Sequence, residues 1–345
     1  MKYLVITTKH HDGFCMYDSR LTDFDIMDAT PFKRDPVKEL SDECKKQGVT
    51  FCIYYSIPDW HHVELPARLS TYRWHSQPKE NADPNKYIDY MCGQLKELLT
   101  KYDAKMVWFD RGDPTTFHEP GKSYATAVNA KKIVETIKSV DPNILINNRL
   151  DSAYDFITPE QEIPDNSSTV YFESCMTMGK AWGYTTYDET LKSSNLLIRN
   201  ICDISHKGGN FLLNIGPRGD GSVPAEQYNR LREIGTWMKI NGEAIYGTKK
   251  SPWREVPDWG RITRKGNTLY MIVFKQPSIG FAILNNINEV PIRVRQLNSS
   301  LPTFDLRPRI LRGGLWMLVQ QQFVQPDPIV FALDFAPGVL DRIEK

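Results

Sequence analysis

The sequence predicts an α/β fold, in which a parallel (β/α) barrel is followed by a small domain of the β-sandwich type. Up to about residue 247, short β-rich runs alternate with helical patterns, as in strand–helix–strand units. These β-rich runs are almost continuously apolar, which is typical of strands buried on both faces. Beyond residue 250, short β-type runs are separated by glycine, proline and asparagine turns. We therefore expect a barrel domain over residues 1–247 and an all-β domain over residues 248–345.

The individual elements follow from where the apolar runs begin and end. One helical pattern starts after Asp35-Pro36 and stops at Gln47-Gly48, which are common start and stop signals. Polar residues cluster directly after strand ends rather than in a glycine-rich phosphate loop, and this favours a barrel. The expected barrel strands are Tyr3–Thr8, Phe51–Ser56, Met106–Asp110, Ile144–Asn147, Val170–Glu173 and Phe211–Ile215. The expected helices are Val37–Gln47, Pro84–Lys101, Tyr124–Val140, Leu191–His206 and Ala225–Asn241. The expected strands of the second domain are Arg261–Lys265, Leu269–Phe274, Ile292–Arg295 and Ile329–Leu333.

The composition argues against several classes of partner. Of the 345 residues, 41% are apolar and 25% are charged, and the formal net charge is +1. This balance, without a lysine and arginine cluster, argues against a nucleic-acid partner. No apolar run approaches the roughly 20 residues that span a bilayer, so we expect no membrane span. The six cysteines lack CxxC or other metal-ligand spacing, and we expect buried free thiols.

The most informative run is Met106-Val107-Trp108-Phe109-Asp110, an apolar strand that ends in a carboxylate. Because side chains alternate along a strand, Trp108 and Asp110 should point the same way. Parallel barrels carry their chemistry at the C-terminal ends of the strands. A carboxylate beside an aromatic wall is suited to carbohydrate chemistry, since it offers a nucleophile and a surface for a sugar. The alternative is a capping or loop aspartate after a buried strand.

Two other strand ends carry candidate ligands. His10 and His11 follow the first strand, where neighbouring residues should point opposite ways, and no HxH or HExxH spacing supports a metal. As neutral imidazoles they would bind sugar hydroxyls, although one of them could instead pack against a helix. Tyr54 and Tyr55 supply one phenol toward the interior and one away from it. Tyr54 is therefore either a site residue or a packing residue.

A second carboxyl group is needed if the chemistry is glycoside hydrolysis, in which one carboxyl is ionised and the other protonated. Asp110 is a candidate for the first, while Glu160, Glu162 and Glu173 are candidates for the second, and their spacing does not choose among them. Prolines on both sides of Glu160 favour a stiff, non-helical loop. Arg149, at the end of the fourth strand, could bind a hydroxyl or keep a carboxylate ionised; a surface ion pair is the alternative.

Taken together, these segments resemble the α-L-fucosidases of glycoside hydrolase family 29. The matching motifs occur in order along most of the chain. They are KHHDGF at Lys9–Phe14, YYS at Tyr54–Ser56, WFD at Trp108–Asp110, NNR at Asn147–Arg149, TPEQEIP at Thr158–Pro164, FESC…WGY at Phe172–Tyr184, and NFLLNIGPRGDG at Asn210–Gly221.

The resemblance assigns roles to individual residues. It implies that Asp110 is the catalytic nucleophile and that Glu160 is the acid/base, with Glu173 as the runner-up. Trp182 is expected to flank the sugar, against the C6 methyl group of fucose. The resemblance implies that the rest of the sugar pocket consists of His10, His11, Tyr54, Trp108 and Arg149.

The implied reaction is retaining hydrolysis of α-linked L-fucose by double displacement, with the two carboxyl groups about 5–5.5 Å apart. The implied partner is a fucosylated oligosaccharide or glycoconjugate, and no metal or organic cofactor is required. The TPEQEIP segment resembles the subgroup that favours α-1,3/1,4-linked fucose. A secreted or periplasmic location is expected from the family.

The resemblance also has a gap. Family members carry an upstream segment with a first barrel strand and a further fucose-binding histidine, whereas this chain opens at the second strand. We therefore expect either a longer natural protein or a shortened homologue whose barrel lacks its first βα unit. Two rival functions follow: a family member that binds fucosylated glycans without turnover, and a metal-assisted hydrolase built on His10, His11, Asp12 and Asp110.

Overall fold

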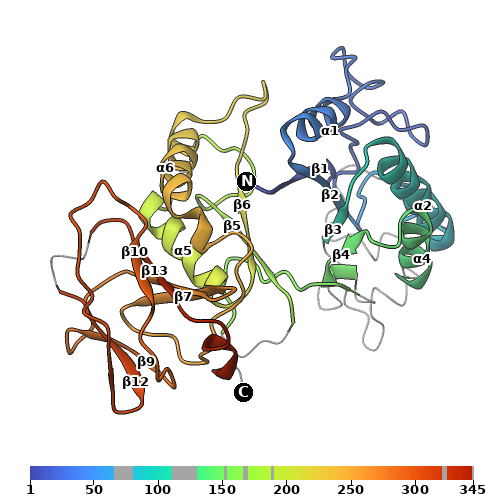
Figure 1. Ribbon diagram of the computed structural model, residues 1–345. Coiled ribbons are helices and arrows are strands. Elements are labelled where there is room, and N and C mark those ends of the chain that lie inside the picture. Colours follow the sequence, from blue (N-terminus) through green and yellow to red (C-terminus); the bar gives the residue numbers. More distant parts are fainter. Residues whose placement is uncertain are drawn as a thin grey trace. The chain divides into compact units, whose positions relative to one another are not determined.

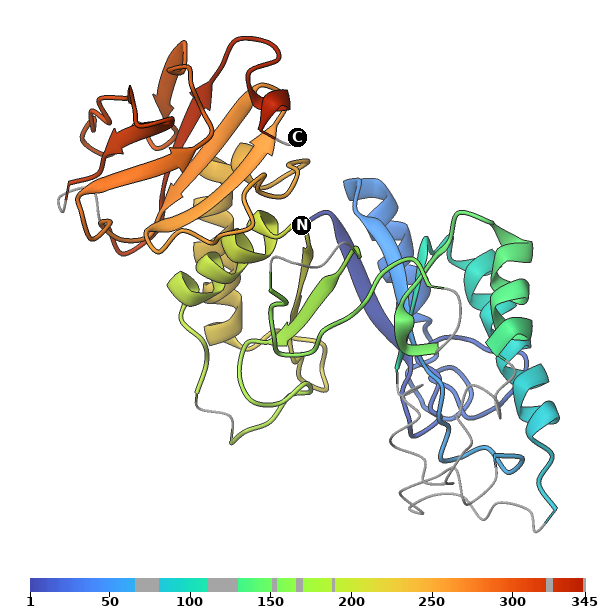
Figure 2. The same ribbon diagram turned by 90° about the horizontal axis from the view of Figure 1, so that it is seen from below.

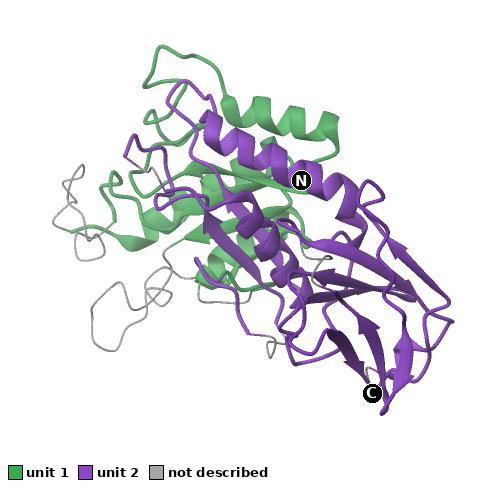
Figure 3. Ribbon diagram, turned by 90° about the vertical axis from the view of Figure 1, so that its left-hand side faces the viewer, with its two compact units in different colours: residues 1–158 green, residues 159–345 purple. Residues whose placement is uncertain are grey.

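The computed structural model describes residues 1–65, 81–110, 130–150, 154–165, 170–187, 190–320 and 325–343. The chain forms two compact units, residues 1–158 and residues 159–345, which are coloured separately in Figure 3. The domain boundary expected at residue 247 stays a prediction.

Unit 1 is a parallel sheet with the strand order β1-β2-β3-β4, and helices α2 and α4 lie side by side (Figure 1). The strands and helices expected from the sequence are confirmed here with small shifts at their ends. The expected helix 124–140 is described only from residue 130, because 124–129 lie outside the described residues. The strands are β1 (Tyr3–Lys9), β2 (Thr50–Ser56), β3 (Met106–Asp110) and β4 (Leu145–Ile146). The helices are α1 (Pro36–Gln47), α2 (Pro84–Lys101), α4 (Ala130–Val140) and the 3₁₀ turn η3 (Asn148–Leu150).

The helix boundaries in unit 1 have local causes. The Asp35 side chain accepts a hydrogen bond from the Lys38 backbone at the start of α1, and Asp83 caps α2 in the same way. Proline occupies the first turn of both helices, where its missing N–H costs nothing. Gly48 ends α1 with φ of 66°, a left-handed conformation that glycine adopts without strain.

The core of unit 1 fixes which way β3 faces. Val107 and Phe109 belong to the main hydrophobic cluster, which also contains Ile88, Met91 and Leu95 of α2. Alternation then turns the residues between and after them toward the opposite face of the sheet. The prediction that Trp108 and Asp110 share a side is confirmed by their shared contact with Arg149.

Unit 2 begins with a parallel pair, β5 (Glu173–Thr177) and β6 (Asn210–Asn214), together with helices α5 (Ser194–His206) and α6 (Ala225–Asn241). The strand expected at Val170–Glu173 was misplaced, because β5 only starts at Glu173. Tyr171 is 79% exposed, whereas all five residues of β5 are buried. Ser174 and Thr177 are buried in β5 although they are polar, so the sequence pattern did not indicate a buried strand at these positions.

The rest of unit 2 is antiparallel (Figure 2). One sheet has the order β10-β13-β8-β7 and the other β11-β12-β9, with a shared apolar core. The sequence predicted β7, β8, β10 and β13 but missed the other three strands. The first sheet consists of β7 (Gly260–Lys265), β8 (Thr268–Val273), β10 (Arg293–Gln296) and β13 (Ile329–Asp334). The second consists of β9 (Phe281–Asn285), β11 (Arg309–Leu311) and β12 (Gly314–Leu318); two 3₁₀ turns are η4 (Gly242–Ala244) and η6 (Leu340–Arg342).

Two expectations from composition can also be compared with the structure. All six cysteines are buried free thiols, as predicted. Within the described ranges, none of the helices combines the length and the apolar character needed to cross a bilayer.

Candidate active site

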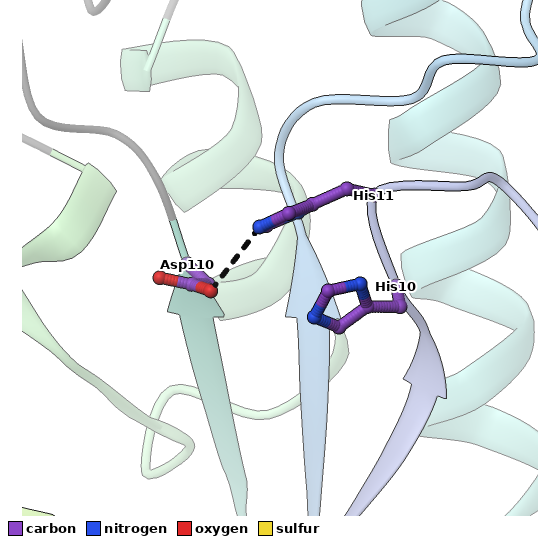
Figure 4. Close-up of side chains that lie close together, drawn as sticks. All are labelled: His10, His11 and Asp110. Carbon is purple, nitrogen blue, oxygen red and sulfur yellow. Dashed lines mark ion pairs between the residues drawn. The ribbon is translucent and has the colours of Figure 1, made fainter. Parts of the chain in front are cut away.

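Asp110 lies at the C-terminal end of β3 (Figure 4). One neutral and one cationic side chain donate hydrogen bonds to its carboxylate. The Tyr54 hydroxyl donates to Oδ2 over 2.6 Å, and Nη1 of Arg149 donates to Oδ1 over 2.9 Å. The Asp110 side chain is 17% exposed, so the carboxylate is partly shielded yet reachable. A guanidinium at this distance favours the ionised form of a carboxyl group.

An aromatic wall flanks this carboxylate. The ring of Tyr54 stacks on Trp108 with centroids 5.6 Å apart, and the His10 ring stacks on Tyr54 at the same separation. The Arg149 guanidinium lies 4.8 Å from the Trp108 ring centroid. The structure therefore brings together most of the predicted pocket residues of unit 1 around Asp110.

His10 and His11 lie together, and the prediction that they point opposite ways was wrong. Their ring centroids are 4.1 Å apart, and Nε2 of His11 is 3.5 Å from Oδ2 of Asp110. Alternation fails because β1 ends at Lys9, with an irregular register just before it, and both histidines occupy the turn that follows. The Gly13 backbone amide donates to the His10 carbonyl and closes that turn.

The other ring nitrogen of His11 explains its orientation. His11 Nδ1 contacts the Ser56 hydroxyl, which itself donates to the Pro58 carbonyl over 3.0 Å. Because the serine proton is used there, the serine oxygen accepts from Nδ1–H, and Nε2 is the nitrogen left to face Asp110. A neutral His11 then offers Nε2 as an acceptor for a sugar hydroxyl.

A buried ion pair beneath the histidines was missed by the sequence analysis. Lys9 is fully buried, and its ammonium group donates to Oδ2 of Asp59 over 3.0 Å. Oδ1 of Asp59 accepts from the backbone amides of His61 and His62. A Cβ at Gly13 would meet Asp59 Oδ1 at 2.2 Å, so this position requires glycine. A lysine at the end of an apolar strand was the only signal in the sequence.

Further contacts around this pair join the loop that follows β1 to the loop that follows β2. The Trp60 backbone amide donates to the His11 carbonyl over 2.7 Å, and the two rings lie 5.4 Å apart. The Tyr87 hydroxyl contacts the Lys9 ammonium at 3.2 Å. Burial raises the pKa of the nearby Cys15 thiol to about 11, which argues against a nucleophilic role for this cysteine.

Arg149 is held from behind by the chain that follows it. Its Nε donates to the Thr158 hydroxyl over 3.1 Å, and Nη2 lies 3.3 Å from the Thr158 carbonyl.

The Asn147 side-chain amide pairs with both the N–H and the C=O of Phe109, each over 2.9 Å. This amide extends the ladder beyond the short β4 and fixes the strand residue just before Asp110.

The remaining candidates belong to unit 2. Glu160 is exposed and its backbone bridges to Cys175 of β5, so the proline-flanked segment is extended and non-helical, as predicted. Glu173 is buried at the first residue of β5. Trp182 is 41% exposed, and its carbonyl accepts from the Asn214 side chain over 2.6 Å.

One group of side chains has the composition of a metal site. Ligand atoms of His10, His11 and Asp110 all lie within 4.8 Å of one another. Asp12 does not belong to this group; its carboxylate instead accepts from the Phe14 amide. The Arg149 guanidinium already neutralises Asp110, and its positive charge opposes a cation at the same carboxylate.

The family model described as Alpha-L-fucosidase matches residues 1–243. This chain belongs to the α-L-fucosidase family. Among curated relatives, the α-L-fucosidase of Dictyostelium discoideum is 29% identical over 299 residues, covering 83% of this chain and 62% of the relative. The chain thus spans about three fifths of that relative's length.

Two solved structures have similar folds. Isoenzyme 1 of Paenibacillus thiaminolyticus α-L-fucosidase superposes with a TM-score of 0.83 at 33% identity, covering 97% of this chain and 83% of that one. A family 29 α-L-fucosidase of Bacteroides thetaiotaomicron gives 0.79 at 26% identity, with 96% and 78% covered. That structure is described as a trapped covalent intermediate formed with 2-fluoro-fucosyl fluoride.

Replacing Lys9 by methionine tests the buried pair. The substitution keeps most of the side-chain volume but leaves Asp59 as a buried carboxylate without its cation. We expect the free energy of unfolding to fall by about 3–5 kcal/mol, the usual cost of breaking a buried ion pair. Urea unfolding of the variant and the unmodified chain measures the difference.

Lys38→Met is the matched control, because the Lys38–Asp42 pair is exposed. It should change the free energy of unfolding by less than about 1 kcal/mol. The double variant Lys9→Met/Asp59→Asn removes the isolated charge and should recover part of the loss. A Lys9→Met chain as stable as the control would contradict this account of the pair.

Proposed function

We propose that this chain carries the catalytic machinery of an α-L-fucosidase that hydrolyses α-linked L-fucose with retention of configuration. The observation that carries the proposal is the carboxylate of Asp110, held by Tyr54 and Arg149 beside the Trp108 wall. The relatives described above are named as fucosidases. A family member that binds fucosylated glycans without turnover gains no support from them.

We propose that the parallel strands belong to a (β/α)₈-type barrel over residues 1–247, and that residues 248–345 form a β-sandwich domain. In support, β1 to β4 are parallel, as are β5 and β6, while every pairing after β6 is antiparallel among the described strands. The similar folds of two fucosidases support the same architecture.

In the first step, Asp110 attacks the anomeric carbon and forms a C–O bond to the sugar. The bond from that carbon to the leaving oxygen breaks, and Glu160 donates a proton to this oxygen. Tyr54 and Arg149 hold the two carboxylate oxygens in place and keep the group ionised before the attack.

In the second step, Glu160 removes a proton from water, which attacks the same carbon and releases fucose. Asp110 is regenerated as a carboxylate and Glu160 as a carboxylic acid. The trapped covalent intermediate of the Bacteroides relative supports a mechanism with a fucosyl ester.

Glu160 is the better candidate for the acid/base because of where each glutamate lies along β5. Glu173 is buried at the N-terminal end of that strand. Glu160 is exposed and lies beside Cys175, nearer the C-terminal end. Parallel barrels use their C-terminal ends for catalysis, and an acid/base must reach both substrate and water.

The sugar pocket of the proposal consists of His10, His11, Tyr54, Trp108 and Arg149, with Trp182 against the C6 methyl group. The substrate is a fucosylated oligosaccharide or glycoconjugate, with α-1,3 or α-1,4 linkage as the preferred class. The stacked rings of His10, Tyr54 and Trp108 give one apolar wall, and Nε2 of His11 gives a polar contact.

Asp110→Gly tests the nucleophile. We expect hydrolysis of α-L-fucosyl fluoride to fall by about 10⁴-fold or more, since the covalent step is lost. Added azide should enter the vacated space, attack the anomeric carbon and expel fluoride, giving β-L-fucosyl azide. Fluoride release measures the rate and NMR identifies the product.

The control is Asp103→Gly, which changes an exposed aspartate whose φ of 53° already suits glycine. Its activity should be normal and insensitive to azide. Full activity of Asp110→Gly without azide would refute the assigned nucleophile, while a chain that binds fucose but never turns it over would favour the binding-only alternative.

Glu160→Gln and Glu173→Gln form a matched pair for the acid/base. Without its general acid, the enzyme should cleave a fucosylated trisaccharide about 10²–10⁴-fold more slowly. Fluoride leaves without a proton, so release of fluoride in the first turnover of fucosyl fluoride should suffer far less. We expect this split for Glu160→Gln only; the reverse result would make Glu173 the acid/base.

Chelation tests the metal-assisted alternative. Because Arg149 already supplies the positive charge at Asp110, we expect trisaccharide hydrolysis to be unchanged after dialysis against EDTA. Steady-state rates before and after dialysis measure this. A rate lost with EDTA and restored by zinc or manganese would instead assign a metal to His10, His11 and Asp110.

A further inference from the structure

Two loops of unit 2 bring together a tyrosine and an arginine that the proposed mechanism does not use. One loop follows β5 and contains Tyr184, which is 43% exposed. The other follows β6 and contains Arg218, whose guanidinium carbon lies 5.5 Å from the Tyr184 ring centroid. Since β5 and β6 are parallel, both loops leave the same, C-terminal end of the pair.

The two loops are fixed to each other. Asn214 Nδ2 donates to the Trp182 carbonyl over 2.6 Å. A Cβ at Gly216 would lie 2.9 Å from the backbone of Gly183 and of Tyr184, so only glycine permits this approach. The Gly216 amide also donates to the Gln227 side chain over 2.9 Å. Tyr184 is therefore an exposed ring on an anchored backbone.

Arg218 is anchored as well. Its backbone amide donates to the Ser222 carbonyl over 2.8 Å, and the Gly221 amide donates back to the Arg218 carbonyl. Gly221 has φ of 82°, which lets the turn close. An exposed ring beside a guanidinium offers a flat apolar surface together with several hydrogen-bond donors. A pyranose ring has the matching features, a face of C–H groups and a rim of hydroxyls.

We infer that Tyr184 and Arg218 form a subsite for the sugar to which fucose is attached, with Tyr184 against its apolar face and Arg218 donating to its hydroxyls. This inference rests on the proposed fucosidase function. Both loops follow the C-terminal ends of parallel strands, which are the ends that carry the substrate-binding groups in parallel barrels. The ligand class is the leaving-group saccharide of a fucosylated glycan.

The test compares two substrates that differ only in the leaving group. A fucosylated trisaccharide fills the subsite, whereas α-L-fucosyl fluoride loses a single atom and cannot reach it. For Tyr184→Ala we expect the ratio of kcat/KM values, trisaccharide over fluoride, to fall about 5- to 10-fold, as for loss of one aromatic contact. Arg218→Ala should lower the same ratio, and Tyr184→Phe should preserve it.

Tyr187→Ala is the matched control, because Tyr187 lies in the same loop and is 90% exposed. It should leave the ratio unchanged. A Tyr184→Ala variant with an unchanged ratio, or one in which Tyr187→Ala lowers it equally, would overturn the subsite. If the unmodified chain cleaves neither substrate, the proposed function itself fails, and this outcome is distinct from a failed subsite.

Discussion

The buried ion pair between Lys9 and Asp59 is the constraint on which the loops around Asp110 depend. Both side chains are removed from water, and such removal costs several kcal/mol per charge unless each group is fully paired. Asp59 meets this condition, since it accepts from one ammonium and two backbone amides. Moving either loop would break these bonds in a region with little water to replace them, so the loops keep one arrangement.

The ion pair also affects the position of His11, whose ring lies beside Asp110. The pair fixes Lys9, which lies two residues before His11, and the Trp60 amide donates to the His11 carbonyl. Ser56 then sets which ring nitrogen faces Asp110. A flip of the ring would place a carbon instead of Nδ1 beside Ser56 and so break this contact. Although His11 lies in a loop, these contacts fix its orientation, as backbone hydrogen bonds fix a residue within a β-sheet.

Much of the fold could be predicted because the signals were local. Asp35, Pro36 and Gly48 define the ends of α1 within a few residues, and alternation along β3 correctly placed Trp108 with Asp110. The missed strands lacked such signals. Strand β12 reads Gly-Leu-Trp-Met-Leu, a short apolar run that suits a helix as well as a strand, and β11 is exposed along its length.

The site was predictable only in part, for a related reason. Residues on strands, such as Tyr54 and Asp110, could be placed because period two fixes their direction. His10 and His11 could not, since the strand ends before them and their direction depends on partners about fifty positions away. The Lys9–Asp59 pair was missed for the same reason: a lysine at the end of an apolar strand was its only local sign, and only the folded chain shows that both residues are buried.

The contacts of Asp110 also show how the site balances reactivity against order. Two strong donors lower the basicity of a carboxylate and so weaken it as a nucleophile, yet without them it would be protonated or misplaced more often. Arg149 is itself restrained by Thr158, which limits how far it can follow the carboxylate. Asp110 is therefore held from two separate elements, by Tyr54 of β2 and by Arg149 of η3. The geometry favours a carboxylate that is fixed in place over one that is as basic as possible.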